Sequence, residues 1–179
     1  MSIIKTLDHI SFGKIVLIRE ELLKQQAAGK KVIRFESGDP NFDLAPHVLE
    51  ALQKAAAAGK THYIPNAGIP ELRRAIFDKV TTTNHVAVHS PEDIFVTNGA
   101  MHALFLVFTC LLEDGDEVVV PDPMWTEVVE NIKLAGGKPV RVPLHKDEGY
   151  LYSAEEIERH ITPKTKAIFL NTPHNPTGA

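Results

Sequence analysis

Residues 166–179 read KAIFLNTPHNPTGA, a short apolar run that passes directly into a loop with two prolines and a glycine. Residues 167–170 have the composition of a β-strand, and polar side chains begin as soon as the run ends. An apolar strand that delivers a polar loop is typical of open α/β sheets, which present ligand-binding groups at the carboxyl ends of their strands. The stretch therefore predicts a sheet of this class with candidate binding residues at its edge.

The chain upstream of this stretch alternates between β-rich runs and helical segments. The runs are apolar on both faces, as in a mostly parallel sheet that helices cover on both sides. We therefore expect an α/β fold. The predicted strands are 94–97, 117–120, 139–142 and 167–170, and the predicted helices between them are 100–112, 124–135 and 153–160.

The first 80 residues are predicted to be mainly helical. A helix over 11–28 with Gly29 as its C-cap is followed by a short strand at 31–35, and further helices are expected at 46–58 and 69–80. No internal repeat and no Ser/Gly linker interrupts the pattern.

Composition excludes several classes of protein. With 44% hydrophobic and 23% charged residues the chain is globular, and a formal net charge of −4 favours neither nucleic acid nor an anionic membrane as a partner. Its single cysteine, Cys110, allows no internal disulfide and no cysteine-cluster metal site. The longest apolar run, 104–112, is too short to span a bilayer, and the N-terminus lacks a signal-peptide pattern. We therefore expect a cytoplasmic location.

The common nucleotide and metal motifs are also missing. Neither G-x-G-x-x-G nor G-x-x-x-x-G-K-[ST] occurs, and there is no H-E-x-x-H. The nine histidines are scattered, so no metal site is predicted.

Two stretches that follow predicted strands could bind a ligand. In TNGAMH, residues 97–102, the chain turns through Gly99 into an apolar helix, whose first backbone N–H groups and dipole would attract an anion such as a phosphate. The alternative is that Gly99 only permits a tight turn. In PDPMW, residues 121–125, the only tryptophan could stack on a flat ligand, or could pack into the core at a helix start.

Two further stretches allow the same pair of interpretations. Gly38, in Gly38-Asp39-Pro40, could bring bare backbone close to a small substrate or could simply form a turn. Asn175, which precedes Pro176, could donate a hydrogen bond to a ligand oxygen or could serve only as a turn former.

Taken together and in order, these stretches resemble the N-terminal part of the class I and II aminotransferases, the aspartate aminotransferase type of pyridoxal phosphate-dependent enzyme (fold type I). The similarity runs from about residue 30 to residue 179. The matching segments are ESGDPNFDLAPHVLEAL, THYIPNAGIPELRRAI, IFVTNGAMHALF, LLEDGDEVVVPDPMW, AGGKPVRVPL and ITPKTKAIFLNTPHNPTGA.

The resemblance implies a division of the chain into two parts. Residues 1–45 would form an N-terminal helical arm and a segment of the small domain. Residues 46–179 would form the first, incomplete part of the large cofactor-binding domain.

The resemblance also implies roles in binding pyridoxal 5'-phosphate. Gly99, Ala100 and Met101 would form the phosphate-binding turn, mainly through backbone N–H groups, because some relatives carry a polar or cationic side chain where this chain has Met101. Trp125 would stack on the pyridine ring, and Asn175 would hydrogen-bond the phenolic oxygen of the ring.

Three further implications concern the substrate, a second subunit and the loop. Gly38 would contact the α-carboxylate region of the substrate, for which Trp125 and Asn175 would also be binding residues. Tyr63 would reach the cofactor phosphate of a neighbouring subunit, which implies a homodimer. His174 stands where many relatives have Asn, a change that we treat as neutral.

No catalytic residue is expected within these 179 residues. In the family, the Schiff-base lysine, the aspartate facing the pyridine nitrogen and two binding arginines all follow the N-P-T-G loop. No lysine of this chain stands in the family's Ser-x-x-Lys or Ser-x-Ser-Lys context. We therefore expect the chain to be an inactive fragment of a longer enzyme. We also expect the X–Pro bonds before Pro123 and Pro176 to be cis, as they tend to be in the family.

The function that the resemblance implies is transfer of an amino group between an amino acid and a 2-oxo acid, with aspartate-type substrates favoured. Two other classes remain open: a pyridoxal phosphate-dependent lyase or synthase on the same fold, and a non-catalytic, aminotransferase-like binding module.

Overall fold

The structure is a computed structural model that describes residues 5–11 and 13–179. The chain forms two compact units. One comprises Met1–Ile33 with Asn98–Ala179, and the other comprises Arg34–Thr97. The division predicted at residue 45 concerns domains of a larger protein and stays a prediction.

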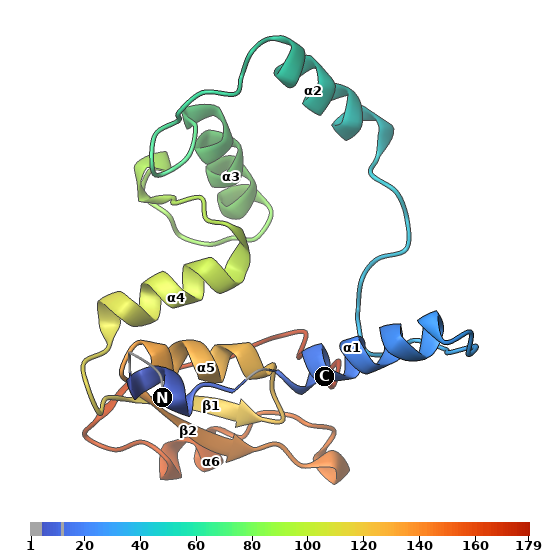
Figure 1. The fold of residues 1–179 in the computed structure, drawn as a ribbon. Coiled ribbons are helices and arrows are strands. Elements are labelled where there is room, and N and C mark those ends of the chain that lie inside the picture. The colour runs from blue at the N-terminus through green and yellow to red at the C-terminus, as the bar shows by residue number, and fades with distance from the viewer. Residues whose placement is uncertain (1–4, 12) are drawn as a thin grey trace. The chain divides into compact units, whose positions relative to one another are not determined.

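The first unit contains a parallel sheet with the strand order β2-β1-β3, as expected for an α/β fold (Figure 1). The central strand β1, Glu117–Asp122, pairs with β2, Lys138–Pro143, on one side and with β3, Thr165–Ile168, on the other. Because the three strands are parallel, their carboxyl ends meet at one edge of the sheet.

Strand β1 is covered on both faces. Val118, Val119 and Val120 are at most 1% exposed. Because successive side chains of a strand point to opposite faces, Val118 and Val120 share one face and Val119 lies on the other. A strand buried on both sides explains the uninterrupted valine run that predicted a parallel sheet.

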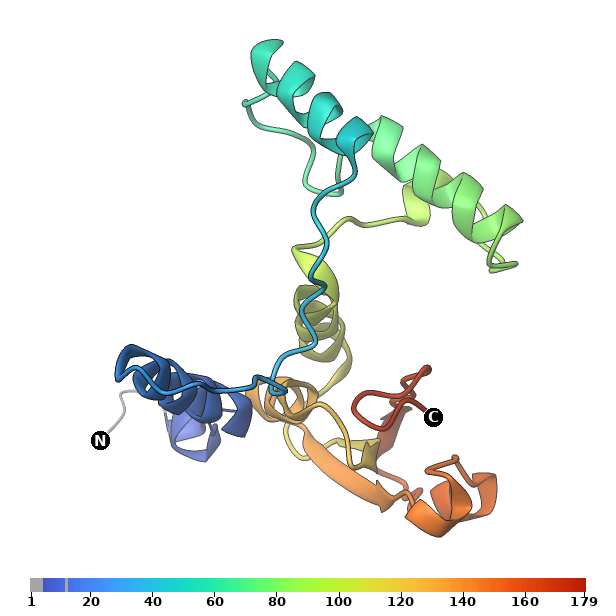
Figure 2. The ribbon, with the colours of Figure 1, turned by 90° about the vertical axis from the view of Figure 1, so that its right-hand side faces the viewer.

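Two helices, α4, Gly99–Leu111, and α5, Thr126–Leu134, pack on the face that bears Val118 and Val120. Figure 1 shows α5 running alongside β1, and Figure 2, turned by 90°, shows the same helix nearly end-on beside the sheet. The core of this face consists of Phe108, Leu112, Val118, Val120, Met124, Val128, Val129 and Ile132.

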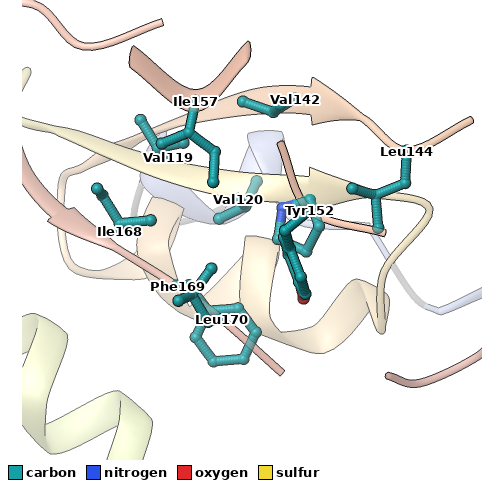
Figure 3. A pocket seen from close by; sticks show the side chains of 10 residues that line it. Val119, Val120, Val142, Leu144, Tyr152, Ile157, Ile168, Phe169 and Leu170 are labelled. Carbon is teal, nitrogen blue, oxygen red and sulfur yellow. The ribbon is translucent and has the colours of Figure 1, made fainter. Parts of the chain in front are cut away.

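The opposite face of the sheet carries α6, Ala154–Arg159. Ile157 of α6 and Tyr152, just before it, line a small pocket on this face together with Val119 (Figure 3). The hydroxyl of Ser153 accepts a hydrogen bond from the N–H of Glu156 at 3.1 Å and so caps the start of α6.

The N-terminal helices belong to the same unit. They are the 3-10 helix η1, Lys5–His9, and α1, Lys14–Ala27. Both the backbone N–H and the hydroxyl of Ser11 donate to the carboxylate of Glu130 on α5, at 3.2 Å each, and this contact joins the segment between η1 and α1 to α5. A second 3-10 helix, η3, spans Lys146–Glu148.

The second unit consists of α2, Pro46–Ala57, α3, Pro70–Thr82, and the 3-10 helix η2, Pro91–Asp93. The guanidinium of Arg73 on α3 donates to the carbonyls of Pro91 and Ile94. Gly68 lies against Val96 so closely that an added Cβ would come within 2.6 Å of a methyl group. These contacts hold α3 and Gly68 against residues 91–96. Most large apolar side chains of the unit are nevertheless exposed.

Two predicted strands are wrong. Residues 31–35 and 94–97 are not β-strands. The second segment is extended at Ile94, but its Val96 N–H bonds only to the Ala67 carbonyl in a loop. A strand requires a ladder with a neighbour, and among residues 5–11 and 13–179 neither segment has one.

The predicted helices are confirmed, with shifted boundaries. The helix expected to begin at residue 124 begins at Thr126, because Trp125 occupies the extended N-cap position after Pro123. The helix expected from residue 11 begins after Gly13. None of the helices in the described part of the chain is long and apolar enough to cross a membrane.

Candidate functional site

A cavity of about 440 Å³ lies in the sheet-containing unit where the chain leaves the carboxyl ends of the strands. Its wall comes from the first half of α4, the segment that enters α5, and the loop after β3. Three of the predicted cofactor-binding residues are brought together there. The lining residues are Ala100, Ala103, Leu104, Met124, Trp125, Val128, Phe169, Leu170, Asn171 and Asn175.

A second, apolar pocket lies on the other face of the sheet, beneath α6 and Tyr152 (Figure 3). Its volume is only about 10 Å³, which is about the space of one water molecule. It is therefore a packing defect, and the larger cavity is the candidate site.

The phosphate-binding turn predicted at the start of α4 has an accessible backbone. Gly99 has a φ of 75°, a conformation that favours glycine, and an added Cβ would meet no atom within 4 Å. No side chain caps the helix N-terminus at Asn98. The first N–H groups of an α-helix have no acceptor within the helix, so this end of the 13-residue helix α4 favours an anion.

The Met101 side chain faces the core, where it is partly buried, and not the cavity. The Met101 carbonyl accepts a hydrogen bond from the side-chain amide of Asn131 at 3.4 Å. This contact fixes the first turn of α4 against α5, which begins directly after Trp125.

Trp125 lies in the cavity wall and is 37% exposed, so it is not enclosed by the core. The neighbouring Met124 is instead buried in the core. Trp125 therefore lies where the sequence predicted an indole that could stack on a flat ligand. The peptide bond between Asp122 and Pro123 is cis, as expected.

Asn175 is held in a loop that is bonded to the end of the sheet. Its backbone N–H donates to the side-chain oxygen of Asn171 at 2.9 Å. The bond between Asn175 and Pro176 is cis, as expected, and the bond between Thr172 and Pro173 is also cis, which the sequence did not suggest.

Gly38 and Tyr63 belong to the other unit, Arg34–Thr97. Gly38 is exposed, and an added Cβ there would meet no atom within 4 Å. The Tyr63 side chain is fully exposed. Their predicted roles toward substrate and a second subunit stay predictions.

Sequence reasoning missed Asn171, which lines the cavity and binds the backbone of Asn175. A signal for it was present, because Asn171 is the first polar residue after the predicted strand 167–170. The contacts that Tyr152 makes with this loop, and those that His174 makes within it, were also missed.

The residues of this cavity fit pyridoxal phosphate. A helix N-terminus with an open glycine suits a phosphate, the face of Trp125 suits an aromatic ring, and the Asn175 amide can donate to a ring oxygen. Apolar side chains form the remaining wall except for Asn171, as in most cofactor sites.

The parallel sheet and the cavity at its carboxyl edge define an α/β protein with a candidate site where open α/β sheets bind their ligands. The sequence profile of the family described as aminotransferase class I and II matches residues 30–179, and the chain belongs to that family.

Relatives agree with this assignment. The chain is 43% identical over 171 residues to the probable aspartate/prephenate aminotransferase of Aquifex aeolicus, covering 96% of this chain and 43% of that protein. It is 42% identical to the aspartate/prephenate aminotransferase of Thermus thermophilus, covering 92% of this chain and 42% of that protein. The chain thus spans less than half the length of these curated relatives.

Solved structures show the same fold. The aspartate aminotransferase from Thermus thermophilus with maleate superposes with a TM-score of 0.94 at 38% identity, over 98% of this chain and 46% of that one. The aromatic aminotransferase from Pyrococcus horikoshii gives a TM-score of 0.77 at 38% identity, over 80% of this chain and 38% of that one. The predicted fold and family are confirmed.

Proposed function

We propose that the protein to which these residues belong is an aminotransferase that moves an amino group between an amino acid and a 2-oxo acid with pyridoxal phosphate as cofactor. The observation that carries the proposal is the cavity that brings Ala100, Trp125 and Asn175 together in a chain of this family.

The cofactor, when bound, supplies an electron sink next to the reacting carbon. The backbone N–H groups at Gly99, Ala100 and Met101 would hold its phosphate, and Trp125 would hold its ring from one face. The Asn175 amide would donate a hydrogen bond to the phenolic oxygen. The apolar wall formed by Leu104, Val128 and Phe169 would keep water from this side of the ring.

The remaining chemical groups are proposed to come from elsewhere in the protein. The cavity wall formed by the described residues includes no lysine and no arginine. In the resembling family the Schiff-base lysine and the carboxylate-binding arginine follow the N-P-T-G loop, and we propose the same arrangement here.

Aspartate-type substrates are favoured, because relatives and solved neighbours are named for aspartate. Aromatic aminotransferases also match this chain. Gly38 is proposed to approach the substrate's α-carboxylate region. A homodimer is proposed as the working assembly, with Tyr63, whose side chain is fully exposed, reaching the partner's cofactor.

The test is an assay of the complete protein with pyridoxal phosphate. Aspartate with 2-oxoglutarate should yield glutamate, and an aromatic amino acid in place of aspartate should give a lower kcat/KM. Cofactor binding with elimination or condensation products would instead indicate a lyase or synthase. Cofactor binding without turnover of any amino acid would indicate a binding module.

A further inference from the structure

The hydroxyl of Tyr152 bonds both backbone groups of Asn171. It donates to the Asn171 carbonyl at 3.1 Å and accepts from the Asn171 N–H at 3.1 Å. Strand β3 ends at Ile168, so Asn171 lies just beyond the ladder. The Tyr152 hydroxyl thus takes the place of a neighbouring strand and fixes the chain where it enters the loop.

His174 anchors the middle of the same loop. It is only 3% exposed, and its ring packs edge-on to the Tyr152 ring, with centroids 6.0 Å apart and planes at 79°. Its Nδ1 shares a hydrogen bond of 2.8 Å with the hydroxyl of Thr177. Its backbone N–H donates to the Ala179 carbonyl, and its carbonyl accepts from the Gly178 N–H.

The Nε2 atom of His174 is buried and has no hydrogen-bond partner among the described residues. Burying an unpaired polar atom costs stability. A phenyl ring would occupy similar space without that cost. What the imidazole adds over a phenyl ring at this position is the bond from Nδ1 to Thr177.

We propose that Tyr152 and His174 are positioning residues that hold Asn175 in the orientation needed to bind the cofactor. The inference rests on the proposed function, because it assigns Asn175 its role there. The path is short: Tyr152 fixes Asn171, and the Asn171 side chain accepts from the Asn175 N–H at 2.9 Å. His174 is the residue before Asn175. Its ring is held between the Tyr152 ring, which it contacts edge-on, and the Thr177 hydroxyl, which shares a hydrogen bond with Nδ1.

Such support matters because a ligand hydrogen bond depends on sub-ångström placement of its donor. Asn175 lies in the loop after β3 and gains no rigidity from a helix or strand. Freeing the loop would leave the amide present but misdirected.

The experiment measures the dissociation constant for pyridoxal phosphate, the absorbance maximum of the bound cofactor, and the thermal unfolding midpoint of the apo form, all in the complete protein. The variants are Tyr152→Phe, which removes only the hydroxyl, and His174→Phe, which keeps a ring. Each should weaken cofactor binding about fivefold, the effect of losing one neutral hydrogen bond. His174→Phe should do so without lowering the unfolding midpoint of the apo form.

A double variant tests whether Tyr152 acts through Asn175. In the Asn175→Ala background, Tyr152→Phe should have no further effect on the dissociation constant, because the group that it positions is gone. The matched control is Tyr150→Phe, two residues away, because the Tyr150 hydroxyl makes no hydrogen bond to the loop among the described residues. Its dissociation constant should equal that of the unaltered protein.

Several results would overturn the inference. These are unchanged affinity in both single variants, additive losses in the double variant, or, in His174→Phe, a loss of affinity in step with a lower unfolding midpoint. If the unaltered protein does not bind pyridoxal phosphate, the proposed function itself fails. If the unaltered protein binds it and Asn175→Ala weakens binding while Tyr152→Phe does not, only the positioning role fails.

Discussion

Asn175 is the residue whose side chain most directly tests the proposed chemistry. A hydrogen bond to a charged oxygen is worth roughly 1.5–3 kcal/mol. Asn175→Ala in the complete protein should therefore lower turnover about 10- to 100-fold and shift the cofactor's absorbance to shorter wavelength, with the fold unchanged by circular dichroism.

The matched variant is Asn175→Asp, which keeps the size of the side chain but replaces its N–H donor with an acceptor. It should be at least as impaired as Asn175→Ala. Normal spectrum and turnover in both variants would reduce Asn175 to a turn former.

A separate prediction concerns Trp125, which is proposed to bind the cofactor by stacking its indole face on the ring. Aromatic stacking contributes about 0.5–1.5 kcal/mol beyond area burial. Trp125→Ala should weaken cofactor binding more than Trp125→Phe, which retains an aromatic face. Equal losses in the two variants, measured by titration of the apo form, would show that the indole does not stack on the ring.

The sequence predicted three cavity residues that lie in segments after apolar runs, and it missed Asn171 and the residues that support the loop. Ala100, Trp125 and Asn175 each lie in a turn or loop that follows such a run, so their place in the site follows from chain order. Tyr152 lies 19 residues before its partner Asn171, and nothing local in the sequence marks that contact. His174 gave no signal because its burial depends on that same tyrosine ring.

At the scale of elements, the valine strand and the helices were predictable because their signals are local. Ser153 and Glu156 mark the start of α6, and consecutive valines mark a strand buried on both faces. Residues 31–35 and 94–97 have strand composition but are not strands, because pairing depends on a partner that local composition cannot supply.

The amino end of β1 carries a pH-dependent contact. The Glu117 carboxylate is buried and accepts from the Thr162 hydroxyl at 2.6 Å and from the Lys138 ammonium at 3.2 Å. The bond from Thr162, followed by that from Lys138, holds the pKa of Glu117 below its ordinary value. A lowered pKa means that the stabilisation is present above the ordinary glutamate pKa of about 4.3 and is lost as the pH falls through the folded-state value.

Thr162→Val should therefore lower the unfolding midpoint of the complete protein most at neutral pH. The difference from the unaltered protein should shrink as the pH falls through the lowered folded-state pKa of Glu117, below which the carboxyl is protonated in both proteins. Thr162→Ser, which keeps the hydroxyl, is the control and should track the unaltered protein. A gap that stays constant between neutral and acid pH would mean that the ionised carboxylate is not involved.

At the scale of the whole molecule, the sheet-containing unit has a buried core, whereas Arg34–Thr97 exposes most of its large apolar side chains. Phe35, Phe42, Tyr63 and Phe95 are all highly exposed. Large exposed apolar groups in one segment are typical of surfaces that other protein covers. This agrees with the proposal that Tyr63 meets a second subunit.

The last prediction concerns the lysine that aminotransferase chemistry requires. A lysine that bonds covalently to the cofactor must reach the ring, and the cavity wall formed by the described residues contains none. Borohydride reduction of the complete protein with bound pyridoxal phosphate, followed by peptide mapping, should therefore give one dominant labelled lysine outside residues 1–179. Residues 1–179 expressed alone should give no dominant labelled lysine and no amino transfer from aspartate to 2-oxoglutarate. Stoichiometric labelling of one lysine within residues 1–179, accompanied by turnover, would contradict the proposed site, because that side chain would have to enter a cavity whose wall includes no lysine.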